Sequence, residues 1–184
     1  MRAHRKPPED SLAGSLLLAH PSLRDANFRR TVVLMTAHGP AGAMGVIVNR
    51  PLEQRLGELD ADFVLGPLAA VPVFAGGPVQ TEQLILAGWR AQPNGFQLHL
   101  GIDPEKAGLL FADEETRIRA FLGHAGWSAG QLEDELKRDS WIVAEAPSDL
   151  FAQPAGEVLW REFLGREGNL WRLLADEPDE AGEN

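Results

Sequence analysis

The apolar positions of the chain fall into short runs instead of long helical stretches. In the first part these runs are Ser15–Ala19, Thr31–Thr36 and Met44–Asn49. The second and third runs are continuously apolar and β-branched, which is typical of strands that are buried on both faces. Because residues 38–42 between them contain glycine and proline, we expect these two strands to form a hairpin.

The middle of the chain repeats the strand pattern. Residues 71–75 predict a strand, and Pro72 indicates either its first residue or a position at the edge of a sheet. Two further runs, 84–87 and 96–100, flank a turn at Pro93-Asn94-Gly95. They predict a second hairpin.

Helical spacing is confined to a few segments. Leucines recur at helical intervals over residues 52–59, which predicts a short helix. Residues 103–113 begin with aspartate, proline and glutamate, a favourable helix start. Residues 156–175 predict a helical C-terminal segment that is interrupted at Gly165 and Gly168.

The stretch from Phe121 to Trp141 reads as a strand, a glycine-rich turn over residues 123–130, a helix and a second strand. Within it, Gly126-Trp-Ser-Ala-Gly130 matches the Gly-x-Ser-x-Gly pattern of a hydrolase nucleophile elbow. Ser128 is therefore the candidate nucleophile.

Two observations weaken the catalytic interpretation of Ser128. All five histidines precede it, so the chain order of the α/β-hydrolase triad is absent, although His20, His38 or His99 remain as partners in another order. Gln131 also stands three residues after Ser128, the spacing of a capping box at a helix start. We favour the cap.

A third interpretation is that the same turn binds a ligand but catalyses no reaction. Gly123, Gly126 and Gly130 leave backbone N–H groups exposed before a helix, where anions bind. No lysine or arginine lies in the turn, and three acids open the helix. This interpretation is therefore weaker than the cap.

Several other residues are candidates for a ligand or partner surface. Gly76 and Gly77 follow a strand and allow close approach of a ligand, although a sharp turn explains them more simply. Asn49 and Arg50 end another strand and offer a fork-shaped cation, against the alternative of a strand stop with a solvated arginine. We add His124, Trp127 and Gln131, which flank Ser128 in the glycine-rich stretch.

Strands interspersed with scattered helices indicate an α+β fold. We expect a mixed, largely antiparallel β-sheet that is covered on both faces by helices and loops. Residues 11–175 form one predicted domain, with room for a small subdomain. Residues 1–10 are expected to be a flexible N-terminal segment, and the acidic residues 176–184 a mobile tail.

Composition narrows the function further. The chain of 184 residues has no cysteine, carries a net charge of −10, and lacks the roughly 20-residue apolar run of a membrane span. We expect a cytoplasmic protein, and the acidic body argues against direct nucleic-acid binding. The histidines lack the spacing of metal ligands, so we expect no metal and no cofactor.

Several of these stretches together resemble the YqgE/AlgH family of small bacterial proteins. The matching blocks are Gly14–Pro21, Asp25–Leu34, Gly42–Leu52, Phe74–Val79 and Leu122–Leu132, in the family's order. Departures are mild: an aromatic residue often stands where this chain has His124, and residues 61–70 look divergent.

The resemblance implies a cytosolic α+β protein. Some members carry the label of a transcriptional regulator, but the family has no agreed activity and no agreed catalytic residues. We therefore expect a non-enzymatic binding or regulatory protein that acts indirectly, through an unidentified protein partner or small ligand. The alternative is a serine hydrolase that uses Ser128. The sequence does not indicate the oligomeric state.

Overall fold

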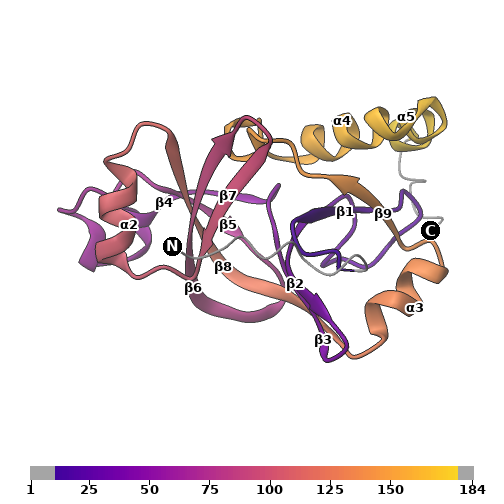
Figure 1. Ribbon diagram of the computed structural model, residues 1–184, viewed down its shortest axis with the longest axis horizontal. Helices are drawn as coiled ribbons and strands as arrows, with labels where there is room; N and C mark the ends of the chain where they lie inside the picture. The colour runs from indigo at the N-terminus through magenta and orange to yellow at the C-terminus, as the bar shows by residue number, and fades with distance from the viewer. Residues whose placement is uncertain (1–10, 178–184) are drawn as a thin grey trace, which may run out of the picture.

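The computed structural model describes residues 11–177. The expectations for residues 1–10 and for the tail after residue 177 lie outside the described part. Nine strands form one mixed, mostly antiparallel sheet, and helices pack around it, which confirms the α+β class (Figure 1).

The strands are β1 (Ser15–Ala19), β2 (Val32–Gly39), β3 (Gly42–Ile47), β4 (Pro51–Arg55), β5 (Pro72–Ala75), β6 (Val79–Gln92), β7 (Gly95–Leu100), β8 (Thr116–Ser128) and β9 (Trp141–Glu145). The helices are α1 (Leu56–Leu59), α2 (Pro104–Phe111), α3 (Gln131–Lys137), α4 (Glu157–Glu167) and α5 (Asn169–Asp176), with 3-10 turns η1 (Ala61–Phe63) and η2 (Leu150–Ala152).

The long strand β8 belongs to both halves of the sheet. Its first half lies between β6, which is antiparallel to it, and β5, which is parallel. Its second half pairs with β3 and so continues into the order β3-β2-β1-β9. In Figure 1 β8 runs between the β4–β7 strands on the left and the β1–β3 and β9 strands on the right.

Both predicted hairpins are present. β2 and β3 pair in antiparallel register across a turn at Gly39–Gly42, and β6 and β7 pair from Gln92↔Gly95 to Ala87↔Leu100. β5 begins at Pro72 and lies between β4 and β8. Of the two positions allowed for Pro72, the strand start is the one observed.

Apolar side chains fill both faces of the sheet. On the β1–β3 half, Leu16 and Leu34 pack with Trp160 of α4 on one face, while Val33 packs with Leu132 of α3 on the other. A third cluster covers the other half beneath α1 and α2. The predicted covering on both faces is confirmed.

The prediction of a helix over residues 52–59 is wrong for its first half. Residues 51–55 form β4, which pairs with β5 through Pro51↔Phe74, and only Leu56–Leu59 make a helical turn. The leucine spacing did not reflect a helix face, because Leu52 is exposed at the edge strand while Leu56 is buried.

The C-terminal helix is interrupted at one glycine and not at two. α4 continues through Gly165, where an added methyl group would touch only the Arg172 side chain. The break falls at Gly168, whose φ of +143° favours glycine.

Gly76, Gly77 and Gly123 allow the segment after β5 to cross the backbone of β8 in the middle of the sheet. A Cβ on Gly76 would lie 2.3 Å from the carbonyl oxygen of Gly123, and one on Gly77 would lie 2.2 Å from that of His124. Gly76 also donates to Leu122 O and accepts from Ile47 N–H, both at 2.8 Å. The crossing therefore connects β5, β8 and β3.

We predict that Gly77→Ala lowers the free energy of unfolding by at least about 3 kcal/mol, because its methyl group would overlap the backbone of β8. Gly95→Ala is the matched control: Gly95 also has positive φ, at +137°, but has no atom within 4 Å of the added methyl. We expect it to cost about 1–2 kcal/mol of backbone strain alone. Equal losses in urea denaturation of the two variants would contradict the steric account.

Candidate functional site

Residues 126–128 lie in a strand and not in a turn. Gly126 pairs with Met44 and Ser128 with Gly42, so β8 extends through most of the segment that was predicted to be a glycine-rich turn. The turn is limited to Ala129 and Gly130 before α3. That prediction is wrong because pairing with β3 satisfies the backbone, whereas a nucleophile elbow places its serine on a sharp strand-to-helix turn.

The Ser128 side chain is bonded to an amide. Its hydroxyl donates to Gln131 Oε1 at 3.3 Å, and its backbone N–H donates to the same oxygen at 3.0 Å. Of the two hydrogen bonds of the predicted capping box, the one from the Ser128 N–H to the Gln131 side chain is therefore present. Gly130, and not Ser128, occupies the N-cap position, which has no side-chain hydrogen bond. A neutral amide oxygen does not take up the proton of a nucleophilic serine.

Two candidate histidine partners are bonded elsewhere. His38 Nδ1 accepts from Leu12 N–H at 3.0 Å, and its Nε2 lies 2.8 Å from Glu133 Oε1. Because Nδ1 accepts, the neutral ring donates from Nε2. His20 Nδ1 is bonded to Ser22 at 2.7 Å. A backbone hydrogen bond, and then the His38 ring, lower the pKa of Glu133.

Asn49 connects three segments of the fold. The residue is buried; its Oδ1 accepts from Val32 N–H at 2.8 Å, and its Nδ2 donates to Arg30 O at 3.0 Å and Gly156 O at 3.1 Å. These bonds use both hydrogens of the Nδ2 group and one acceptor position of Oδ1, and they join β2 to the start of α4. The side chain is thereby turned into the protein instead of toward a ligand.

Arg50 is bonded to the loop before β2. Its guanidinium donates to the carbonyl oxygens of Asn27 at 2.6 Å, Arg29 at 3.1 Å and Ala26 at 3.3 Å. Burial, and then the neighbouring charge of Arg29, lower the pKa of Arg50. Arg50 is half-buried, and its guanidinium connects the strand end to this loop.

The glycine candidates and His124 meet at the backbone crossing. The space beside Gly76 and Gly77 is filled by the backbone of β8, which leaves no room for a ligand at these two glycines. His124 pairs with Val79 in the sheet, and its buried Nδ1 has no hydrogen-bond partner within residues 11–177.

Glu135 is a polar centre that the sequence interpretation missed. Its Oε2 accepts from the indole N–H groups of Trp127 at 2.9 Å and Trp141 at 2.8 Å, and its Oε1 accepts from Gln131 at 3.0 Å. The (i, i+4) spacing of Gln131 and Glu135 was the available signal. Trp127 and Gln131 are therefore joined through this carboxylate, which fastens α3 to β8 and β9.

Arg119 is a second missed residue. It is only 5% exposed, and its guanidinium donates to Val48 O and Phe151 O, both at 3.1 Å. The guanidinium also lies between two rings: its central carbon, Cζ, is 4.4 Å from the centre of the Phe74 ring and 4.7 Å from the centre of the Phe151 ring. A single arginine inside the apolar run 118–122 was the signal that could have found it.

Arg119 continues a stack of planar side chains. The ring centres of Phe96 and Trp89 are 3.9 Å apart, and those of Trp89 and Phe151 are 5.1 Å apart. The Phe151 ring in turn contacts the Arg119 guanidinium. We call Phe96, Trp89, Phe151, Arg119 and Phe74 the aromatic column. Burial, and then the charge of Arg117, lower the pKa of Arg119 to about 10. No carboxylate neutralises this cation among its hydrogen-bond partners.

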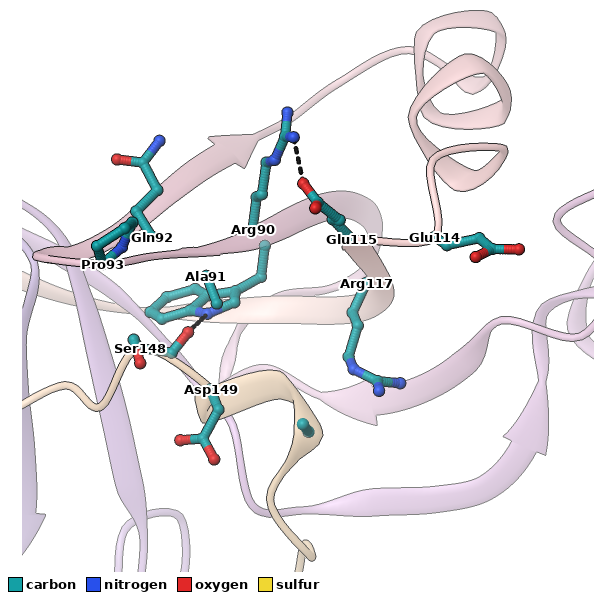
Figure 2. Close-up of a pocket in the computed structure, with 11 residues that line it drawn as sticks. Arg90, Ala91, Gln92, Pro93, Glu114, Glu115, Arg117, Ser148 and Asp149 are labelled. Carbon is teal, nitrogen blue, oxygen red and sulfur yellow. Dashed lines mark hydrogen bonds and ion pairs between the residues drawn. The ribbon is translucent and has the colours of Figure 1, made fainter.

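A cavity of about 680 Å³ opens beside the aromatic column. Figure 2 shows its labelled residues, from the end of β6, the start of β8 and the segment that precedes η2. Trp89 forms part of the wall and donates its indole N–H to Ser148 O at 2.7 Å.

Within residues 11–177, no three histidine or carboxylate side chains are grouped as metal ligands. None of the helices in that part is long and apolar enough to cross a membrane.

Fold and site together define a small α+β protein in which the conspicuous polar side chains bind the protein's own backbone. The model of the AlgH-like family, DUF179, matches residues 16–171. The chain belongs to this family, which confirms the resemblance seen in the sequence blocks.

Relatives and solved structures agree with this assignment. A UPF0301 protein of Streptomyces coelicolor is 37% identical over 95% of this chain and 96% of its own length. The solution structure of AlgH from Pseudomonas aeruginosa, also UPF0301, has a TM-score of 0.66 at 28% identity and covers 96% of this chain and 100% of that one. A Corynebacterium diphtheriae structure shares the fold, with a TM-score of 0.71 at 24% identity, over 96% of this chain and 95% of that one.

We predict that Arg119→Ala lowers the free energy of unfolding by about 3 kcal/mol, because it leaves buried carbonyl groups unpaired and a hole between two rings. Arg117→Ala is the matched control on the same strand. Arg117 is exposed, and its loss should change stability by less than about 0.5 kcal/mol. Similar chemical-denaturation midpoints for the two variants would show that the aromatic column does not stabilise the fold.

Proposed function

We propose that this protein is a non-enzymatic binding protein, and that any regulatory role is indirect. The observation that carries the proposal is the position of Ser128. Its hydroxyl is bonded to the Gln131 amide, on a strand that is paired with β3. Catalysis by serine needs a base within hydrogen-bond reach. His20 and His38 are bonded elsewhere, and His99 lies on β7, which pairs with β6 and not with the strand that carries Ser128.

Exposed apolar side chains on the C-terminal helices support binding to another protein. Leu170 and Leu173 of α5 are 65% and 69% exposed, and Val158 of α4 is 62% exposed. Apolar side chains of this size are typical of contact surfaces when they lie together.

The net charge of −10 favours an indirect role in any regulation of transcription. An acidic protein repels the phosphate backbone, and direct DNA binding would need a basic surface. We also propose a cytoplasmic location, which the family resemblance implies and which a chain without cysteine permits.

A serine-reactive fluorophosphonate probe tests the proposal against a hydrolase. We expect the wild-type protein and Ser128→Ala to show the same background labelling, while a reference serine hydrolase reacts in parallel. Labelling of the wild type that disappears in Ser128→Ala would overturn the proposal. Ser128 is exposed, so its removal should leave the fold intact.

A further inference from the structure

The cavity beside the aromatic column has walls from three separate segments. One wall comes from Trp89–Pro93, the second from the residues that open β8, and the third from the segment at Ser148–Ala152. Because Trp89 is bonded to Ser148 O and stacked on Phe151, the third wall is held in place against the sheet.

Two of the five charged side chains that line the cavity, Arg90 and Glu115, are paired with each other. Arg90 forms ion pairs with Glu115 and, at 3.6 Å, with Asp113. Figure 2 shows Arg90 and Glu115 together on one side of the cavity, while Glu114 points away from it. Two charged side chains remain, Arg117 and Asp149.

Arg117 is a cation without a counter-ion among residues 11–177. It makes no hydrogen bond or ion pair with the described residues, and it pairs across the sheet with Trp89. It lies two residues from Arg119 on the same face of β8, and the hydrogen-bond partners of Arg119 are carbonyl groups. An anion at Arg117 would relieve the repulsion between these two cations.

Asp149 provides the opposite charge on the third wall. Its Oδ2 accepts from Gln153 at 2.8 Å, and its other oxygen has no partner within residues 11–177. Arg117 and Asp149 extend to the same side in Figure 2 but do not form an ion pair with each other. A ligand that joins them must carry a positive group as well as a negative one.

We propose that the cavity binds a small zwitterion, a free amino acid or a short peptide. The carboxylate of the ligand accepts two hydrogen bonds from the Arg117 guanidinium, and its ammonium group donates to Asp149. Glu115 and Asp149 balance the charges of the two arginines, so no excess of positive charge favours a ligand with several phosphate groups. This inference rests on the proposed function, since it supplies the ligand of a non-enzymatic binding protein.

Titrations followed by NMR amide shifts test the site. The probes are glycine, glycylglycine and triglycine, which separate the two charges by increasing distances, with acetate as the anion alone. At least one zwitterion should give saturable shifts at Arg117, Ser148 and Asp149. Arg117→Gln and Asp149→Asn should each weaken it at least tenfold, and Arg161→Gln, an exposed arginine on α4, should leave it unchanged.

Three results would overturn the inference: no saturable shift with any zwitterion at millimolar concentration, saturable shifts only outside the cavity, or acetate binding as tightly as the zwitterions with no effect of Asp149→Asn. None of them changes the outcome of the serine-probe experiment. Failure of this site and failure of the proposed function are therefore distinguishable.

Discussion

The shared strand β8 is the constraint on which the rest of the structure depends. One strand completes both halves of the sheet, and it can do so only because Gly76 and Gly77 let the backbone after β5 cross it in direct contact. Side chains at the crossing would force the two halves apart. The largest apolar cluster extends across both halves, from Leu16 and Val46 to Phe121 and Trp89, and so depends on this junction.

Polar side chains near the junction stabilise the connections instead of facing a substrate. Asn49 joins β2, the preceding loop and α4, and Arg50 bonds to the loop carbonyls. Arg119 bonds to Val48, the residue after β3, and to η2 while lying between two rings. Because each of these groups is already paired, a reaction centre built from them would have to break the fold. The charged groups that remain available to a ligand are Arg117 and Asp149, which line the cavity beside the aromatic column.

Much of the fold could be predicted from local sequence patterns. The two hairpins, the strand at Pro72 and the helix that begins after Asp103 follow from turn residues and caps that act over a few positions. The family blocks also predicted the class of protein. What could not be read locally was pairing over long distances, such as the extension of β8 along β3 through Ser128.

The candidate site was harder to predict for the same reason. Sequence patterns marked Asn49, Arg50 and Ser128, but they could not show whether a carbonyl group, an amide or solvent would face each one. Arg119 and Glu135 were missed because their partners come from distant segments: Val48 and Phe151 for one, Trp127 and Trp141 for the other. Hydrogen-bond partners of this kind are a property of the tertiary fold.

The central claim is that β8 and the glycine crossing make both halves of the sheet one cooperative unit. Native-state hydrogen exchange measures this most directly, because it gives an opening free energy for each amide. We expect amides in β1 and β2 and amides in β5 and β6 to exchange through one global opening, with the same free energy and the same dependence on denaturant. A distinctly lower opening free energy for either half would show that the halves unfold separately and would contradict the claim.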